Sequence, residues 1–161
     1  FKLPQSIICH HSKSNKFSSM KNPLPNEGTL VHTPLKQIIS QLAISFLPLT
    51  QERHSFIVNH ISSHIVWEKD ENLLSLALGN LLKNIILLSR EQCIQVHSSQ
   101  NGDCTLIRLN IGDSRFYNNL VIKMVALQQV AEQMGGSIRM SYDERGGTTI
   151  AFSVAENRKA A

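Results

Sequence analysis

Two asparagines, Asn80 and Asn84, stand four residues apart in the apolar stretch NLLKNIILLS of residues 80–89. A helix places residues four apart on the same face. Asparagine is a poor residue for a helix interior, because its short amide competes with the backbone for hydrogen bonds. The two amides either satisfy nearby backbone groups or act on a ligand, since an amide oxygen can accept hydrogen bonds and is an acceptable ligand for a hard cation such as Mg²⁺.

The other residue types that carry chemistry form no comparable pattern. None of the seven histidines is followed directly by an acidic residue. His60 and His64 lie on a predicted strand, which would separate them by about 13 Å, so a two-histidine metal site is not expected. No Ser-His-Asp order or pair of carboxylates stands out. The three cysteines form no CxxC pair, which indicates reduced thiols and a cytoplasmic setting.

The composition is that of one globular domain. A chain of 161 residues is long enough to bury its own core. The net charge of +4 is scattered along the chain, so no nucleic-acid partner is expected. The longest apolar runs are too short to cross a membrane, and no direct membrane insertion is expected. We expect the chain, which begins without Met or a signal-peptide pattern, to be a segment of a longer protein or a processed form.

The N-terminal part of the chain predicts a linker followed by a helix. Residues 1–27 are rich in Ser, Lys, Asn and Pro and predict a loosely ordered arm. The ordered domain is predicted over residues 28–155, with a polar tail at 156–161. It begins with a short strand at 30–32. Thr33 is the predicted N-cap of the first helix, with Pro34 at its first position. Apolar residues then recur at a helical spacing through Leu47, and Pro48 is predicted to end the helix.

The middle of the chain predicts strands around a buried helix. Two extended segments are predicted at residues 54–61 and 64–68. Asp70 is the predicted cap of a second helix, which runs to about Ser89 and is apolar on almost every side. Two further strands, EQCIQVHSS and DCTLIRLNI, are predicted on either side of a turn at Asn101-Gly102.

The C-terminal part predicts a third helix and a last pair of strands. After an irregular stretch, the helix is predicted from about Asn119 to Met134 and ends at Gly135-Gly136. Its inward face is predicted to consist of Leu120, Val121, Met124, Leu127, Val130 and Ala131. The segments SIRMSY and TTIAFSV predict the final two strands. This order of elements predicts a two-layer α/β (α+β) sandwich, in which three helices cover one face of a mixed, mostly antiparallel sheet.

Three segments resemble the ATP-binding catalytic domain of sensor histidine kinases in their order and spacing. They are DENLLSLALGNLLKN, EQMGGSI and RGGTTIAFSV. The wider superfamily, which shares the Bergerat ATP-binding fold, includes DNA gyrase, the heat-shock chaperones and the mismatch-repair ATPases. The resemblance covers roughly residues 28–154 and implies that fold.

The resemblance implies roles for several residues. Asn84 matches the family asparagine whose oxygen helps hold Mg²⁺ against the ATP phosphates, and Asn80 would orient a water or a phosphate during catalysis. Thr148, in the family's last glycine-rich hairpin, is assigned to cofactor binding. Mg-ATP is the cofactor implied for an active member. The plain alternative, in which both amides merely satisfy backbone groups, stays open.

The implied adenine site departs from the family pattern. The first glycine box, Asp-x-Gly-x-Gly, falls on residues 110–114. Asn110 replaces the aspartate that accepts from the adenine amino group, Gly112 keeps the first glycine, and Ser114 replaces the second. A neutral acceptor forms a weaker hydrogen bond than a charged one, by about 1 kcal/mol. A shifted register would place Asp113 there instead, but no glycine follows it at the right position.

The implied phosphate site departs further. The second glycine box falls on residues 121–124, where Val121 and Lys123 replace both glycines. In the family these glycines let a helix N-terminus present its N–H groups to the phosphates. Lys123 either fills the vacant phosphate position or is a solvated surface charge. The mobile ATP lid is much shortened, and Ile85 and Leu87 replace the family's alanine and lysine.

These features predict a degenerate catalytic domain of a two-component sensor histidine kinase. ATP binding is expected to be weak or lost, and signal transduction to proceed by docking. The expected partners are the dimerising helical domain of the same or another kinase and a response regulator, with a homodimer as the possible state of the full-length protein. The expected location is the cytoplasm, where the domain is free or forms the cytoplasmic part of a membrane-bound sensor.

Two alternatives stay open. One is a functional kinase that binds Mg-ATP through Asn80, Asn84 and Asn110 and phosphorylates a histidine on a dimerising helical hairpin. The other is a stand-alone regulator that resembles the anti-sigma-factor serine kinases. An upstream hairpin with a His-Glu or His-Asp dipeptide would favour a sensor kinase, and its absence would favour the regulator.

Overall fold

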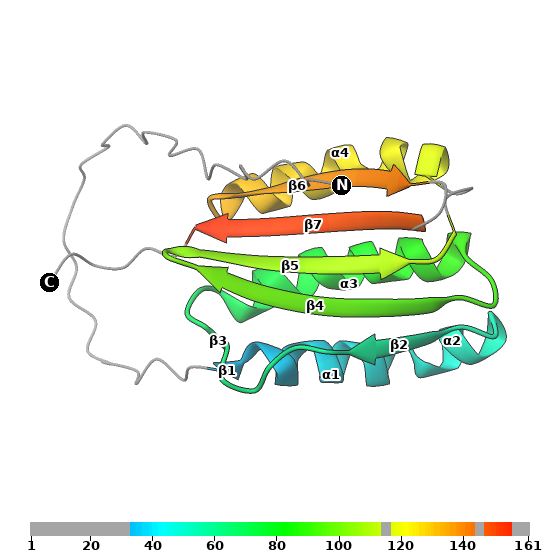
Figure 1. The fold of residues 1–161 in the computed structure, drawn as a ribbon, viewed down its shortest axis with the longest axis horizontal. Helices are drawn as coiled ribbons and strands as arrows, with labels where there is room; N and C mark the ends of the chain where they lie inside the picture. Colours follow the sequence, from blue (N-terminus) through cyan, green and yellow to red (C-terminus); the bar gives the residue numbers. More distant parts are fainter. Residues whose placement is uncertain (1–32, 114–116, 144–146, 156–161) are drawn as a thin grey trace, which may run out of the picture.

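The computed structural model describes residues 33–113, 117–143 and 147–155, which form two layers (Figure 1). The predicted arm, the strand at 30–32 and the tail lie outside the described residues. In chain order the elements are β1 (Thr33–Pro34), α1 (Leu35–Ser45), α2 (Leu47–Glu52), β2 (Phe56–Asn59), β3 (Val66–Trp67), α3 (Glu71–Leu88), β4 (Cys93–Asn101), β5 (Cys104–Ile111), α4 (Tyr117–Gln133), β6 (Gly136–Asp143) and β7 (Gly147–Ala155).

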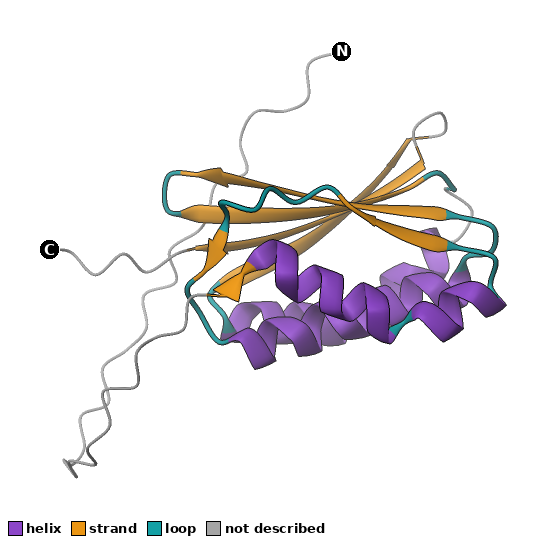
Figure 2. Cartoon of the chain, turned by 90° about the horizontal axis from the view of Figure 1, so that it is seen from below, coloured by secondary structure: helices purple, strands orange, loops and turns teal. Residues whose placement is uncertain are grey.

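The main sheet is mixed and mostly antiparallel, as predicted. Its five strands follow the order β2-β4-β5-β7-β6. Only β2 and β4 are parallel, and α3 lies in the connection between them. The short strands β1 and β3 form a separate antiparallel pair. All helices lie on one side of the sheet, which confirms the predicted two-layer sandwich (Figure 2).

The strand register divides the main sheet into two faces. On β5, Leu109 and Ile111 are buried against the helices, and Asn110 between them points to the other side. Leu109 is opposite Val96 on β4 and Ile150 on β7, which are also buried, so the alternation continues across the strands. We call the side packed against α1, α3 and α4 the helix face. The other side, which no described helix covers, is called the open face (Figure 2).

The central helix α3 supplies much of the core. The Asp70 side chain accepts hydrogen bonds from the N–H groups of Asn72 and Leu73, which confirms the predicted cap. By length and composition alone, α3 is apolar enough to cross a membrane. In this fold it lies between α1 and α4, with one side against the sheet (Figure 1). Its fully buried residues are Leu74, Ala77, Leu78, Leu81, Leu82, Ile85 and Ile86.

The structure corrects the predicted ends of the first helix. Thr33 is not its N-cap: Pro34 holds that position without a side-chain hydrogen bond, and α1 begins at Leu35. The Thr33 hydroxyl instead donates to the Glu71 carboxylate over 2.7 Å, which ties β1 to the first turn of α3. Pro48 does not end the helical region, because proline is tolerated in a first helical turn and here lies in the first turn of α2.

Two details of the third helix also differ from prediction. It begins at Tyr117, two residues before the predicted start. Val121 does not face the core: it is 42% exposed, whereas Leu120 and Leu127 are buried as predicted. Gly135 follows the helix with a positive φ of 70°, which confirms the predicted C-terminal stop. The turn between β4 and β5 is also confirmed near its predicted place, over Gly102-Asp103.

Candidate functional site

One end of the domain gathers most of the residues that the sequence assigns to a site. The last turns of α3, the first turns of α4, the end of β5 and the start of β7 lie together there (Figure 1). Ile111 at the end of β5 is paired with Thr148 at the start of β7. The helices α3 and α4 run antiparallel beside each other above these strand ends (Figure 1).

Asn80 and Asn84 lie on the flank of α3 that faces α4. Residues on a helix are about 100° apart, which places both asparagines far around the axis from Gly79. A side chain at Gly79 would contact Leu42 of α1, so the Gly79 flank faces α1. Asn80 is exposed and Asn84 is half-buried. The predicted common face of the two amides is therefore present, and it lies on the side of α3 away from α1, toward α4.

The amide of Asn84 bonds to its own helix. Its Nδ2 donates to the backbone oxygen of Asn80 over 2.9 Å. This contact is the one expected if the amide only satisfies a backbone group. Within the described part of the chain, the Asn84 Oδ1 accepts no hydrogen bond, so one oxygen remains available to a ligand. The metal role of Asn84 and the catalytic role of Asn80 stay predictions.

Lys123 lies on the flank of α4 that faces α3, and Val121 does not. On α4, Gln128 donates and accepts hydrogen bonds near the outer edge of the sheet, and its Oε1 accepts from the N–H of Ile138 on β6. Lys123 lies about 140° away from Gln128 around the helix axis, on the flank that faces α3. Its side chain is exposed. Within the second glycine box, residues 121–124, Lys123 is therefore the cationic side chain that can approach the flank of α3 that carries Asn84.

Thr148 is present at this end but is closed to a ligand. Its side chain is fully buried on the helix face, and its Oγ1 donates to the backbone oxygen of Asp113 over 2.9 Å. The opposite residue on β5 is the buried Ile111, so the helix face offers hydrocarbon next to Thr148. The cofactor role of Thr148 stays a prediction, and any ligand would have to open this contact.

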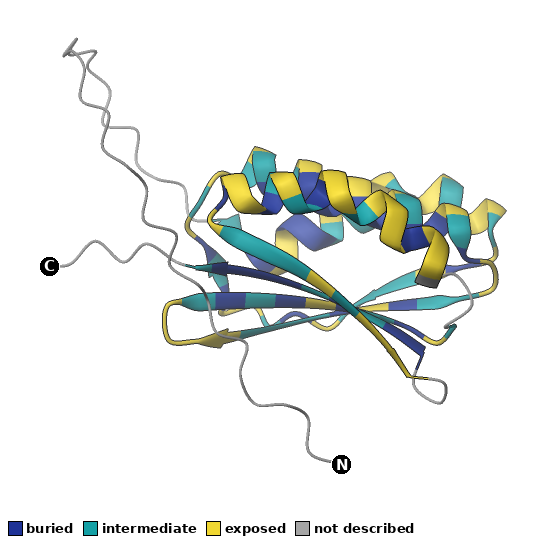
Figure 3. Ribbon diagram, turned by 90° about the horizontal axis from the view of Figure 1, so that it is seen from above, coloured by how far each residue is buried: buried dark blue, intermediate teal, exposed yellow. Residues whose placement is uncertain are grey.

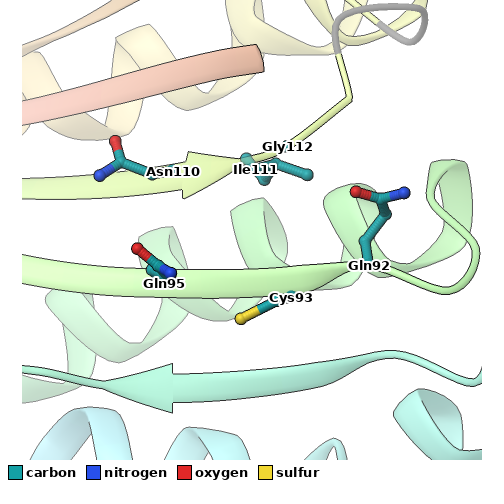
Figure 4. Close-up of a pocket in the computed structure, with 6 residues that line it drawn as sticks. All are labelled: Gln92, Cys93, Gln95, Asn110, Ile111 and Gly112. Carbon is teal, nitrogen blue, oxygen red and sulfur yellow. The ribbon is translucent and has the colours of Figure 1, made fainter. Parts of the chain in front are cut away.

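Asn110 is on the wrong side of the sheet to join these residues. It lies on the open face, where its Oδ1 accepts from the Thr149 hydroxyl over 3.2 Å. There it lines a shallow cavity of about 270 Å³ (Figure 4). The cavity is formed by Gln92, Cys93, Gln95, Asn110, Ile111 and Gly112. The structure therefore separates Asn110 from Asn84, Lys123 and Thr148 by the thickness of the sheet.

The described residues supply only part of the Mg-ATP site that the family resemblance implies. On the Asn84 side of the sheet they offer the amides of Asn80 and Asn84, the lysine Lys123, and, just after β5, Asp113, whose backbone oxygen accepts from Thr148. A Cβ at Gly112 would meet only Gln92 Oε1, at 3.7 Å, so no described protein atom requires a glycine there. Residues 114–116, which belong to the first glycine box and lid, lie outside the described chain.

The sequence analysis did not expect a two-histidine metal site. Among the described residues, no group of three or more His, Cys, Asp or Glu side chains is placed to hold a metal. His60 and His64 do not form a pair: the His64 ring hydrogen-bonds to Ser62, and the His60 ring stacks on His97. Cys93 and Cys104 lie on the neighbouring strands β4 and β5, and no disulfide joins them.

An exposed apolar surface at the site was missed by the sequence reasoning. Val121, Ile122 and Val125 of α4 are 42%, 78% and 66% exposed. We call these three residues the α4 patch. Leu87 of α3, which is 39% exposed, lies at the same end of the helical layer. The exposed residues follow the outer side of the helices in Figure 3. Ile122 and Val125 fall outside the predicted inward stripe. Their positions on the helix could therefore have indicated an exposed apolar surface.

Comparison with known proteins identifies the fold. No family model and no curated protein matches the sequence. Among solved structures, the Acinetobacter baumannii histidine kinase AdeS matches 79% of this chain and 67% of its own, with a TM-score of 0.68 and 11% identity. The cytoplasmic segment of histidine kinase QseC matches 82% of each chain, with a TM-score of 0.59 and 19% identity.

A third relative is histidine kinase ThkA. Its nucleotide-free catalytic domain matches 78% of this chain and 96% of its own, with a TM-score of 0.66 and 13% identity. Its complex with the response regulator protein TrrA matches as well, and there this chain spans 43% of the kinase. The elements described above, from the strand order to the helices on one face, therefore have the Bergerat fold of the ATPase domains of these histidine kinases.

Proposed function

We propose that this domain is a degenerate catalytic domain of a two-component sensor histidine kinase, with weak or lost ATP binding, which transmits signals by docking. The observation that carries the proposal is the chemistry at the first turns of α4. Where the family presents glycines and bare N–H groups to phosphates, this chain presents the α4 patch. Branched apolar side chains offer phosphates no hydrogen bond, and they gain free energy when a protein partner covers them.

The α4 patch has the properties of a protein contact surface. Ile122 and Val125 are more exposed than any other apolar residue described on α4. Contiguous exposed apolar residues on a soluble domain mark interaction sites more often than single ones do. Leu87 adds a further exposed apolar residue on the neighbouring helix α3. A surface of this kind packs well against the apolar ridges of another helix or helical hairpin.

These properties favour two partners. The first is the dimerising helical domain of the same or another kinase, which would also bring two copies of the full-length protein together. The second is a response regulator, and the complex of ThkA with TrrA provides the analogy. The proposed location is the cytoplasm, in line with the cytoplasmic segment of QseC. The functional kinase remains the rival, because the Asn84 oxygen and Lys123 are still available to a nucleotide.

The first prediction is that Mg-ATP does not stabilise the domain. We expect millimolar Mg-ATP or Mg-ADP to shift the melting temperature of the purified domain by less than about 1 °C. A nucleotide present at about 100 times its dissociation constant would stabilise the domain by about 2.7 kcal/mol. For a domain of this size that corresponds to a shift of roughly 5 to 10 °C. A shift of that size in the unaltered domain, lost in Asn84→Ala, would restore the functional kinase as the better model.

The second prediction is that the α4 patch carries docking. Each dimerising helical hairpin from the histidine kinases of the source organism is purified and titrated onto the immobilised domain. We expect at least one hairpin to bind, and the double variant Ile122→Glu, Val125→Glu to weaken that binding by more than about tenfold, because a buried interface does not tolerate unpaired charge.

The matched control for this experiment is Ile44→Glu. Ile44 is 71% exposed on α1, away from the α4 patch, so its replacement adds a similar charge without touching the proposed surface. It should leave hairpin binding within about twofold of the unaltered domain. If Ile44→Glu weakens binding as much as the α4 variant does, the contact is not through α4. If no hairpin binds, the docking proposal is wrong for that class of partner.

A further inference from the structure

A row of basic side chains crosses the open face of the sheet. His60 follows β2 and stacks on His97 of β4, with ring centroids 4.6 Å apart and planes inclined by 13°. His97 is paired with Arg108 of β5, and Arg108 with Ala151 of β7. Ala151 is paired in turn with Arg139 of β6. We call His60, His97, Arg108 and Arg139 the cationic row. At the usual spacing between strands, it extends over about 19 Å.

The side chains next to the cationic row are neutral. Strand pairing places a row of open-face residues on each of its sides. These residues are Gln95, Asn110, Thr149 and Ser141 on one side, and Ser99, Leu106, Ser153 and Ser137 on the other. The described acidic residues of β4 to β7 and their hairpin turns, Asp103 and Asp143, lie at the two ends of the sheet. Within the described chain, neither Arg108 nor Arg139, both exposed, makes a hydrogen bond or ion pair.

The cationic row is therefore self-repelling. Burial, together with the nearby charges of His60 and Arg108, lowers the pKa of His97. An anion bound over the row would reduce the repulsion and make protonation of the imidazoles more favourable. Unpaired, exposed arginines are well suited to such an anion, because the planar guanidinium donates two parallel hydrogen bonds to a carboxylate or phosphate.

The shape of the open face favours a protein segment over a nucleic acid. Proteins that bind single-stranded nucleic acids stack the bases on aromatic side chains. Apart from the two histidines, the described open-face positions include one ring, Phe56, at the start of the edge strand β2. Between the two arginines, Ala151 leaves the surface shallow, so a polypeptide can come close to the sheet. About 13 residues of a helix would span the row.

We propose that an acidic segment of a partner protein docks across the open face, with its Asp and Glu side chains on the cationic row. This surface lies on the opposite side of the sheet from α4 (Figure 2). It is therefore independent of the α4 patch, and both surfaces can be occupied at once. The proposal does not depend on whether the domain binds nucleotide.

The test uses a fluorescent peptide of Glu and Ala, about 15 residues long, titrated with the whole chain at low salt. We expect the peptide to bind, and a matched peptide with Gln in place of Glu not to bind. The double variant Arg108→Gln, Arg139→Gln should bind about tenfold more weakly, the effect of two exposed ion pairs of up to about 1 kcal/mol each. Both arginines are exposed, so circular dichroism should show an unchanged fold and melting temperature.

Two comparisons decide the outcome. The control Lys36→Gln, Lys83→Gln removes the same charge from exposed positions on the helices and should change affinity less than about twofold. If both double variants lose the same affinity for the Glu peptide, the loss is an effect of net charge alone, and the proposal is overturned. A single-stranded oligonucleotide of equal charge should bind more weakly than the peptide. Tighter binding of the oligonucleotide would overturn the assignment to an acidic protein segment.

The pH dependence provides an independent readout. Affinity for the Glu peptide should rise as the pH falls to about 6, because burial and the nearby charges of His60 and Arg108 lower the pKa of His97, and a bound carboxylate would favour its protonated form. His60→Gln should reduce this rise without changing the fold, because His60 is exposed. An affinity that does not change with pH would exclude the two histidines from the docking surface.

Discussion

Replacing Gly147 by alanine is expected to destabilise the domain by about 3 kcal/mol or more. Gly147 opens β7 with a φ of 80°, a backbone conformation that side chains disfavour. A Cβ there would also overlap the backbone oxygen of Ile111 and approach the Cα and backbone carbon of Gly112, both at 2.8 Å. Backbone atoms cannot rotate away as a side chain would, so the end of β5 and the start of β7 would have to separate.

Urea denaturation followed by circular dichroism measures this loss, and a thermal melt should show a fall of roughly 10 °C. The matched control is Gly102→Ala. Gly102 also has a positive φ, 59°, but an added Cβ there has no atom within 4 Å, so it isolates the cost of backbone conformation at about 1 kcal/mol. Equal losses in the two variants would show that the strand ends shift to accommodate the methyl group.

The consequence of Gly147→Ala for function is local. Thr148 and Ile111 occupy the same strand ends, beside the candidate site between α3 and α4. Gly147 matches the glycine-rich hairpin of the family, and its close approach to β5 gives that motif a structural reason in this chain. The motif therefore persists here for packing, whether or not a nucleotide binds next to it.

The fold was largely predictable because its signals are local and periodic. The cap at Asp70, the apolar length of α3 and the turn at Gly102 each depend on a few neighbouring residues. The errors came from contacts between distant parts of the chain. Thr33 has the chemistry of an N-cap, but its hydroxyl is bonded to Glu71, 38 residues away. No pattern near Thr33 indicates that partner.

The candidate site was less predictable, because a motif assigns a position along the chain and not a face. Asn110 matches the family aspartate in the first glycine box, yet strand alternation turns its side chain to the open face. A one-residue change of register would bring it to the helix face and remove Ile111 from the core. The extent of burial of Ile111 selects the observed register, and that burial is visible only in the assembled sheet.

The departures from the family are also linked to each other. Ile85 replaces the family's alanine, and both Ile85 and Ile111 are fully buried. Thr148 is closed by its bond to Asp113. We interpret these contacts as packed core in place of part of a ligand cleft, which would stabilise the apo domain. This interpretation predicts that the family residues cannot be restored without loss of stability.

Ile85→Ala, which restores the family alanine after Asn84, is therefore expected to destabilise the domain by about 3 kcal/mol. Ile85 is 0% exposed in the last turn of α3, so removal of three carbon atoms leaves a cavity against the sheet. The better helix propensity of alanine offsets only a few tenths of a kcal/mol. Urea denaturation measures the difference, and a loss below about 1 kcal/mol would mean that α3 repacks and that Ile85 is not essential to the core.

Leu87→Lys is the matched control, because it restores the family lysine at a position that is 39% exposed. Its effect should stay within about 0.5 kcal/mol, since a lysine near a helix C-terminus is favoured by the helix dipole. The combined variant, Ile85→Ala with Leu87→Lys, should be as unstable as Ile85→Ala and should still show no melting shift with Mg-ATP. If the combined variant instead gains a shift of several degrees, Ile85 and Leu87 alone block nucleotide binding, and the remaining polar residues around Asn84 and Lys123 suffice to bind a nucleotide.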